Sequence, residues 1–245
     1  MLETTTDKFL NGRVLLRQPR RGYRAAIDPV LLAAAVPARR GEHVLDLGCG
    51  AGAAMFCLAA RVSGLTITGV ELQEDYLSLA QAGARLNAAL GAFELFSGDV
   101  TRPSRNLPAN SFHHVMMNPP YFETGKYDAG PSVHKSQAQA MANDQLVLWT
   151  KSAYGRLRDK GTLTVIYPVD GFADLLNVMG GKFGALTVFP LWPKSGAAAK
   201  RVLVQGKKGS KAPLKLLSGM ILHEDGGYTA QANALLRDAH ALIMS

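Results

Sequence analysis

The sequence predicts an α/β fold with a mostly parallel, seven-stranded sheet covered by helices on both faces. Short apolar runs rich in β-branched residues alternate with longer segments of helical spacing, which is the pattern of βαβ units. A glycine-rich turn, VLDLGCGAGA, joins one such run to a helix. The 245-residue chain has no internal repeat and no low-complexity linker, and it is long enough to bury a full core.

Seven strands are expected in order along the chain. Each is a short run of apolar and β-branched residues, and helical segments separate most of them, so most of the strands are expected to run parallel. The expected strands are residues 43–47, 65–70, 93–97, 113–118, 162–168, 185–192 and 200–206.

Helices are expected between these strands and near the carboxyl terminus. Their ranges are 52–62, 74–90, 143–158, 170–180 and 232–244. Asn143 is a candidate N-cap for the third of them, and Gly180-Gly181 is expected to end the fourth. Upstream, Asp28 is a candidate cap for a short helix that begins with Pro29, a residue favoured in the first helical turn.

The formal charge of +8 is unevenly distributed along the chain. Residues 1–40 carry eight basic groups against three acidic ones, and residues 182–215 carry eight basic groups with no acid. The region between them is slightly acidic. Two basic flanks around a near-neutral middle indicate a polyanionic partner. Solvated surface lysines that keep the protein soluble are the alternative.

Several classes of protein are disfavoured by composition. No apolar run approaches the 18 or so residues of a membrane span, and the start, MLETTTDKFLNGR, lacks the apolar core of a secretory signal. Cys49 and Cys57 lack the pairing and the partner histidines of a zinc site. We therefore expect a cytoplasmic protein with reduced thiols, no metal and no membrane span, and the sequence predicts no particular oligomeric state.

The stretch VLDLGCGAGA, residues 44–53, is an apolar strand that runs into glycines and then into a helix. Read loosely, Gly48, Gly50 and Ala53 satisfy the dinucleotide-binding fingerprint. The stretch also reads Asp46-x-Gly48-x-Gly50-x-Gly52, with an acid inside the strand. A carboxylate there suits a cationic amino group better than a pyrophosphate. This turn resembles the first motif of class I S-adenosylmethionine-dependent methyltransferases.

Two further acids follow the second and third expected strands. Glu71 ends ITGVE, where a carboxylate can accept hydrogen bonds from both ribose hydroxyls. Asp99 in SGDV resembles the methyltransferase acid that meets the adenine amino group, and Val100 offers the neighbouring backbone N–H. The resemblance therefore implies that S-adenosyl-L-methionine is the cofactor and that these residues bind it together with Asp46 and the glycines.

The tetrapeptide Asn118-Pro119-Pro120-Tyr121 follows the fourth expected strand, and its prolines cannot continue the strand ladder. It resembles the fourth motif of amino-methyltransferases that act on adenine, cytosine or glutamine side chains. The resemblance implies that the Asn118 side-chain oxygen and the Pro119 carbonyl accept the two hydrogens of the target amine. Tyr121, with Phe122 beside it, would stack on a planar base.

Flanking segments narrow the resemblance to a family. Residues 15–34, NPPYF, KRVLVQGKKG and YTAQANALLRDAHALIM are similar to the bacterial tRNA adenine-N6-methyltransferases, which modify the adenosine beside the anticodon of a valine tRNA. The similarity runs from about residue 8 to the end. It implies a Rossmann-like methyltransferase domain at 43–245, preceded by a basic segment and capping helix at 1–42. The implied partner is the anticodon stem-loop of tRNA.

The same resemblance assigns uses to residues outside the core motifs. Asp28 matches an acid that precedes a Leu-Leu pair in the family, although Pro29 follows it here where glycine is common. The basic flanks are expected to grip tRNA phosphates through salt-sensitive contacts. These flanks comprise Arg17, Arg20, Arg21, Arg24, Lys200, Arg201, Lys207, Lys208 and Lys211. His134 is expected to be an exposed loop residue.

Three alternatives remain open at the level of sequence. Protein glutamine methyltransferases use the same Asn-Pro-Pro-Tyr chemistry but carry a sizeable helical domain ahead of the core, whereas about 42 arginine-rich residues precede it here. A nicotinamide-dependent oxidoreductase rests on the loose glycine fingerprint alone and leaves residues 118–121 unexplained. An RNA-binding protein could keep the methyltransferase fold without turnover.

Overall fold

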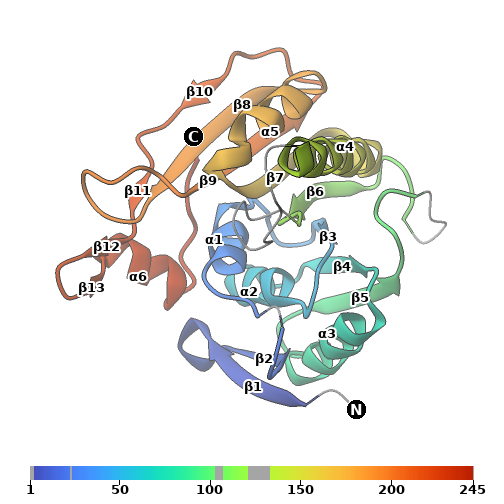
Figure 1. The fold of residues 1–245 in the computed structure, drawn as a ribbon. Helices are drawn as coiled ribbons and strands as arrows, with labels where there is room; N and C mark the ends of the chain where they lie inside the picture. Colours follow the sequence, from blue (N-terminus) through green and yellow to red (C-terminus); the bar gives the residue numbers. More distant parts are fainter. Residues whose placement is uncertain (1–2, 23, 103–106, 121–132, 245) are drawn as a thin grey trace.

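The fold is built around one large twisted sheet (Figure 1). The computed structural model describes residues 3–22, 24–102, 107–120 and 133–244, apart from the side chains of 133–142. Across this part of the chain the longer strands lie in the order β8-β9-β7-β6-β3-β4-β5, and β9 alone runs antiparallel to its neighbours. Two short strands, β10 and β11, both pair with β8 in parallel. The predicted mostly parallel α/β fold is confirmed.

The strands lie close to their predicted ranges, and β3 matches its prediction at both ends. Their bounds are β3 His43–Leu47, β4 Thr66–Glu71, β5 Ala92–Ser97, β6 Phe112–Met117, β7 Leu157–Pro168, β8 Phe183–Trp192, β9 Arg201–Lys208, β10 Lys215–Leu216 and β11 Met220–Ile221. A small antiparallel pair, β12 His223–Glu224 and β13 Gly227–Tyr228, lies outside the main sheet.

Helices cover both faces of the sheet, as the sequence predicts. Their bounds are α1 Asp28–Ala35, α2 Ala53–Arg61, α3 Glu74–Leu86, α4 Val133–Arg156, α5 Phe172–Gly180 and α6 Ala230–Leu236, with 3-10 turns at Leu10–Gly12 and Val169–Gly171. One cluster of buried apolar residues joins the sheet to α1 and α2. A second cluster joins the opposite face to α4 and α5.

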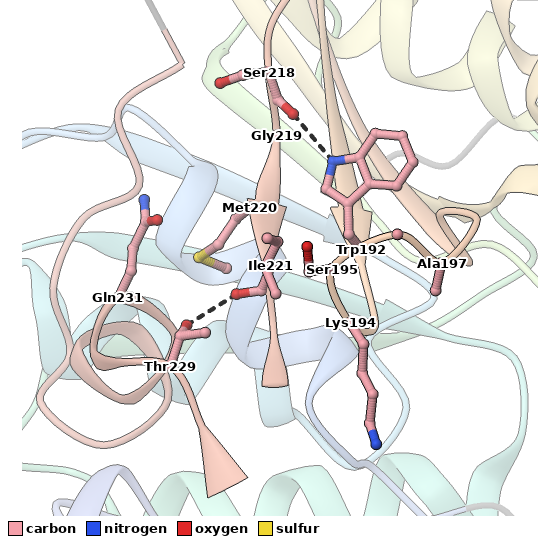
Figure 2. Close-up of a pocket in the computed structure, with 11 residues that line it drawn as sticks. Trp192, Lys194, Ser195, Ala197, Ser218, Gly219, Met220, Ile221, Thr229 and Gln231 are labelled. Atoms are coloured by element: carbon pink, nitrogen blue, oxygen red, sulfur yellow. Dashed lines mark hydrogen bonds between the residues drawn. The ribbon is translucent and has the colours of Figure 1, made fainter. Parts of the chain in front are cut away.

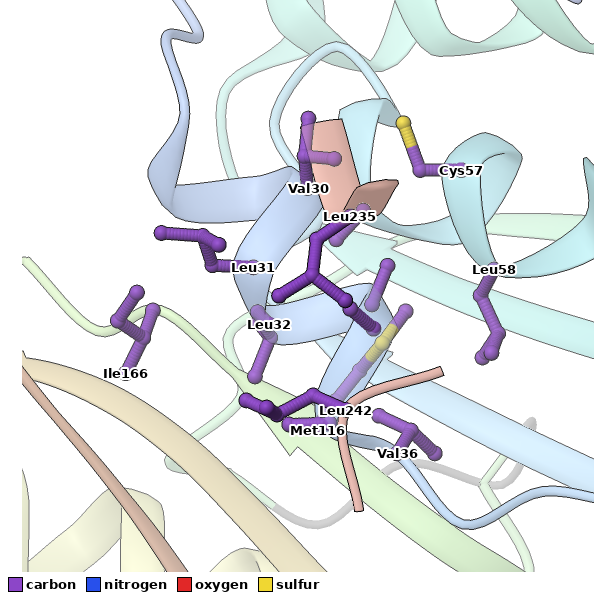
Figure 3. Close-up of a cluster of buried hydrophobic side chains, with 14 of the residues drawn as sticks. Val30, Leu31, Leu32, Val36, Cys57, Leu58, Met116, Ile166, Leu235 and Leu242 are labelled. Atoms are coloured by element: carbon purple, nitrogen blue, oxygen red, sulfur yellow. The ribbon is translucent and has the colours of Figure 1, made fainter. Parts of the chain in front are cut away.

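The helix α1 is the centre of the first cluster (Figure 3). Leu31 and Leu32 are fully buried and share the cluster with Met116 and Ile166 of the sheet. The carboxyl-terminal segment joins the same cluster through Leu235 and Leu242. The backbone N–H of Leu242 donates to the Ala34 carbonyl at 2.8 Å. The chain end is therefore part of the core that positions α1.

An amino-terminal hairpin, β1 Thr4–Phe9 and β2 Val14–Pro19, was not predicted. The first strand is TTTDKF, and its polar composition conceals it. The buried residues of β2 and the side chain of Asn87, which is distant in sequence, hold the hairpin in place. Asn87, at the end of α3, accepts from the Leu15 N–H at 3.0 Å and donates to the Leu15 carbonyl at 2.7 Å. A buried side-chain amide thus completes the edge of β2.

Several predicted helix boundaries are wrong. α4 begins at Val133, so Asn143 lies inside the helix and not at its cap. His134 consequently falls in α4 and not in a loop, and its side chain lies outside the described part of the chain. α6 ends at Leu236 because Ala239 takes a left-handed φ of 60°. Asp28 does not cap α1, since its carboxylate pairs with Arg201 instead.

Candidate active site

The carboxyl ends of β3, β4, β5 and β6 meet at one edge of the sheet, and they open into a cavity of about 650 Å³. Ligands bind at this edge in open α/β sheets. The lining includes most of the residues singled out in the sequence, namely Asp46, Gly48, Gly50, Glu71, Asp99, Val100, Asn118 and Pro119. Gly52 lies at the N-cap of α2 beside this turn. Tyr121 and Phe122 lie outside the described residues.

The glycine turn after β3 requires glycine for two physical reasons. Gly48, Gly50 and Gly52 take left-handed φ angles of 69°, 55° and 89°, which side chains other than glycine rarely adopt. In addition, a Cβ at Gly48 would lie 2.4 Å from Cη2 of Trp149. The bare backbone of Gly48 therefore lets α4 approach, and Trp149 also lines the cavity.

Glu71 holds this turn from the neighbouring strand. Its Oε2 accepts from the Gly50 N–H at 2.9 Å, and its Oε1 accepts from the Gln73 N–H at 2.8 Å. Each carboxylate oxygen can accept a second hydrogen bond from a ligand. Glu71 is thus placed both to shape the turn and to face the cavity.

Asp46 is a buried carboxyl whose Oδ2 has no hydrogen-bond partner in the part of the chain that the structure describes. Burial, and then the nearby charge of Glu71, raise the pKa of the Asp46 carboxyl to about 7. A buried oxygen without a partner is costly in a free protein. Its position in the cavity wall suits a cationic ligand group that would donate to it.

Asp99 and Val100 follow β5 at the same edge. Thr101 donates to Asp99 Oδ1 from its hydroxyl at 2.6 Å and from its N–H at 2.9 Å. These bonds, the hydroxyl first, lower the pKa of Asp99. Its Oδ2 pairs with Arg102 at 3.2 Å. The acid is therefore ionised and held at the cavity wall.

Asn118 follows directly after β6, where the sequence places it. Its side chain is half-buried and makes no hydrogen bond with another described residue, so its amide is available to a ligand. Pro119 is buried and Pro120 is exposed. The described backbone contains no cis peptide bond. The amide stands in the same cavity as Asp46 and Glu71.

Part of the cavity wall was missed from the sequence. Gln18 and Ala25 come from the unpredicted hairpin and the segment after it, Pro29 and Leu32 come from α1, and Gln145 comes from α4. Gln18 is buried, and its Oε1 accepts from the Ala25 N–H at 2.7 Å while its Nε2 donates to Asp7 at 2.6 Å. In the sequence, Gln18 is recognisable only as a polar residue beside apolar ones, and an ordinary edge strand shows the same pattern.

The predicted substrate-binding residues outside the motifs fall into two groups. Arg24 pairs with Asp7 at 2.6 Å and donates to the Pro19 carbonyl. Arg201 pairs with Asp28 at 3.0 Å. Lys200, Arg20 and Arg21 are exposed. The exposed group is therefore free for an outside partner, whereas the two paired arginines also hold the N-terminal segment and α1.

Lys208 was expected to grip phosphate, and this expectation is wrong. Its side chain is only 7% exposed. The ammonium donates to Asn110 Oδ1 at 2.7 Å and to the carbonyls of Tyr154 and Leu157 at 2.9 and 2.6 Å. It also lies 4.6 Å from the centre of the Tyr154 ring. A buried cation with three acceptors therefore holds β9 against α4 and β7.

Replacing Lys208 with alanine is expected to lower the free energy of unfolding by about 2–4 kcal/mol, because the carbonyls of Tyr154 and Leu157 lose this charged donor. Chemical denaturation measures this change. Lys207→Ala is the matched control, since that neighbouring lysine is exposed and should change stability by no more than about 0.5 kcal/mol. Equal stabilities for the two variants would contradict a structural role for Lys208.

The described part of the chain contains neither a membrane-spanning helix nor a cluster of metal-binding side chains. None of the helices found there is long and apolar enough to cross a membrane. No group of three or more His, Cys, Asp or Glu side chains in the described part of the chain is arranged to hold a metal ion. Cys49 and Cys57 are buried free thiols, as the sequence suggested.

Comparison with known proteins gives consistent matches. The family model described as methyltransferase small domain matches residues 26–189. The tRNA1(Val) (adenine(37)-N6)-methyltransferase of Shewanella sp. strain MR-7 is 28% identical over 224 residues, covering 89% of this chain and 92% of that protein. The protein of the same name from Dickeya chrysanthemi is 25% identical and covers 95% and 94%.

A solved structure shares both fold and sequence with this chain. It is a predicted O-methyltransferase from Agrobacterium tumefaciens, 30% identical, with a TM-score of 0.73. The match covers 88% of this chain and 98% of that one. A second protein therefore shares the overall arrangement of strands and helices.

Proposed function

The chain belongs to the methyltransferase small-domain family, and on that basis we propose that it methylates the N6 amine of an adenosine in the anticodon loop of a valine-type tRNA. It is a methyltransferase, and S-adenosyl-L-methionine is its cofactor. The names of the relatives support the finer assignment, because proteins matching nearly the full chain are called tRNA1(Val) adenine-N6-methyltransferases. A tRNA substrate would place the reaction in the cytoplasm.

The residues present fit the cofactor. Asp46 Oδ2 is buried without a partner, so it suits the ammonium of the methionine part. The left-handed glycines bring backbone N–H groups close to the ligand without side chains in the way. Glu71 is assigned to the ribose hydroxyls, and Asp99 and the Val100 N–H to the adenine edge. When bound, the cofactor supplies an electrophilic methyl group.

The observation that carries the proposal is the placement of Asn118-Pro119 in the wall of the same cavity. An exocyclic amine is a poor nucleophile because its lone pair is delocalised into the ring. If the Asn118 side-chain oxygen and the Pro119 carbonyl accept its two hydrogens, the nitrogen turns towards tetrahedral geometry and its lone pair points at the methyl group. Catalysis then comes from positioning and directed acceptors, without a strong base.

The remaining assignments concern how the RNA is held. Tyr121 and Phe122 follow the acceptor pair and are assigned to stacking on the extruded base. Lys200 is exposed and is assigned to phosphate contact. Arg24, Arg201 and Asp28 already form ion pairs, so we assign all three to shaping the entrance to the cavity, and we assign the remaining N–H of Arg24 to contact with RNA. The division of the chain at residue 42 stays a prediction.

The acceptor class is tested by incubating the enzyme with methyl-labelled cofactor and two acceptors together, unmodified valine tRNA transcript and a glutamine-bearing translation release factor. We expect label in the tRNA alone. Label in the protein alone would establish the glutamine alternative. Cofactor binding with no label in either acceptor would favour an RNA-binding protein without turnover. Heat-denatured enzyme is the control for nonenzymatic transfer.

A further inference from the structure

A second hollow of about 440 Å³ lies on the carboxyl-terminal part of the chain, and no role has been assigned to it so far (Figure 2). It is bounded by the end of β8, the loop between β8 and β9, β11 and the start of α6. Lys194, Ser195 and Gln231 are exposed side chains in its wall, while Met220 is buried in its floor. It is an open groove with both apolar and polar walls.

The groove opens at the same sheet edge as the active-site cavity. β8 runs in the same direction as β6, because β9 is antiparallel to both β7 and β8. Trp192 therefore ends β8 at the edge where Asn118 follows β6. Three strand spacings, about 14 Å, separate β8 from β6, and the sheet register places Trp192 three residues, about 10 Å, beyond the level of Asn118. A polymer bound at Asn118 needs only a short run of residues to reach the groove.

Direct contacts between residues link the groove to the active-site cavity. Arg201 begins β9, immediately after the groove loop, and pairs with Asp28 at the start of α1. Pro29, the next residue, lines the active-site cavity. Met220 in the groove floor belongs to the same apolar cluster as Leu32, which also lines that cavity. The groove and the cavity thus share one rigid support.

The groove presents one oriented aromatic ring. The Trp192 Nε1 donates to the Ser218 carbonyl at 3.0 Å, which holds the half-buried indole in one orientation (Figure 2). Gly219 permits this contact, since a Cβ there would lie 2.8 Å from Nε1 and 2.2 Å from the Pro190 carbonyl oxygen. A fixed indole ring is a stacking surface that accepts any nucleobase.

Three polar side chains around the indole are available to a ligand. The side chains of Lys194, Ser195 and Gln231 make no hydrogen bond with any other described residue. They offer a cation, a hydroxyl and an amide, which match a phosphate and the edges of a base. The acids of the neighbouring β12–β13 pair, Glu224 and Asp225, are not among the residues of the groove wall. Residues 182–215 are wholly basic in their charge.

We propose that this groove binds a nucleotide that flanks the methylated adenosine in the RNA, with its base on Trp192 and its phosphate on Lys194. The inference rests on the proposed function, because it assumes a polynucleotide substrate. It adds a subsite outside the catalytic cavity, and it explains how the enzyme can hold the strand on one side of an extruded base. Ser195 and Gln231 are the groups available to hydrogen-bond that nucleotide.

Binding of unmodified valine tRNA transcript to four variants tests the subsite. Trp192→Ala should weaken affinity about tenfold, whereas Trp192→Phe should keep it within about twofold because phenylalanine still stacks. Lys194→Ala should weaken affinity and reduce the slope of log affinity against log salt by about one. Lys182→Ala is the matched control, since Lys182 is exposed just before β8, at the opposite edge of the sheet.

A second readout covers the case in which Trp192→Ala fails to fold. The chain has two tryptophans, so stacking on Trp192 should quench part of the wild-type fluorescence when tRNA is added. Trp192→Phe should lose that part while still binding. Unchanged quenching in Trp192→Phe, or equal affinities of Lys194→Ala and Lys182→Ala, would overturn the subsite. A wild-type enzyme that methylates no tRNA would overturn the proposed function instead.

Discussion

Replacing Asn118 with alanine is expected to lower the rate of methyl transfer by about a hundredfold to a thousandfold, while cofactor affinity stays within about twofold. The large effect follows because the Asn118 oxygen is, in the proposed reaction, one of two acceptors that direct the amine lone pair. Removal of one directed polar group from a catalytic site costs about that much. The cofactor is assigned to groups on other strands. Single-turnover kinetics with saturating tRNA isolate the chemical step from binding and release.

A matched control separates loss of chemistry from loss of structure. Asn177 is an exposed asparagine on α5, and Asn177→Ala should leave the rate unchanged. Calorimetry should give similar cofactor affinities for wild type, Asn118→Ala and Asn177→Ala. A rate for Asn118→Ala within threefold of wild type, about 0.6 kcal/mol, would show that the amide does not take part in the reaction.

Replacing Asp46 with asparagine is expected to have the second largest effect, a loss of cofactor affinity of about 10- to 100-fold at pH 8. The ionised carboxylate would make a charge-assisted hydrogen bond to the cofactor ammonium, and such bonds contribute about 1.5–3 kcal/mol. An amide offers an oxygen without the charge. Isothermal titration with S-adenosylmethionine measures the difference, and Asp225→Asn, a change in an exposed turn acid, is the control.

The affinity for S-adenosylmethionine should also depend on pH, and the raised pKa of Asp46 sets the direction of this dependence. Burial, and then the charge of Glu71, raise the pKa of Asp46 to about 7 in the free protein. Below that pH the carboxyl is protonated and must release its proton to pair with the ammonium. Affinity should therefore rise about tenfold per pH unit up to about pH 7 and then level off. Asp46→Asn should show no such rise.

Stability should change in the opposite sense. Because the pKa of Asp46 is raised in the folded state, the folded protein binds more protons than the unfolded chain between about pH 4 and pH 7. The free energy of unfolding of the free enzyme should fall as pH rises through that window. Asp46→Asn should avoid this loss and be the more stable protein at pH 8. A wild type that is more stable than Asp46→Asn at pH 8 would contradict an unpaired buried carboxylate.

The sequence predicts many of the residues that line the cavity, because the motifs stand at the ends of parallel strands. Once residues 43–47 and 113–118 are assigned as strands of one parallel sheet, the carboxyl ends meet, and Asp46, Glu71 and Asn118 must share one edge. The order of the motifs along the chain therefore predicts that their residues lie together in the folded protein. The same reasoning gives the glycine turn, whose left-handed φ angles only glycine adopts readily.

Features that depend on distant pairs could not be predicted in this way. Lys208 has the sequence environment of a surface lysine, yet it is buried and its ammonium donates to Asn110, 98 positions earlier. Asp28 has the sequence position of a helix cap, yet it pairs with Arg201, 173 positions later. The hairpin β1–β2 has little apolar periodicity, and Asn87 of α3 completes its edge. The local propensity of a segment for helix, strand or turn gives no information about these contacts.

The central claim is that the acceptors at Asn118 and Pro119 select the exocyclic amine of an adenosine. Nucleoside mass spectrometry of valine tRNA transcript, digested after incubation with enzyme and labelled S-adenosylmethionine, tests it most directly. We expect N6-methyladenosine as the labelled nucleoside. Label in a 2′-O-methylated nucleoside, in 1-methyladenosine, or in no nucleoside would contradict it.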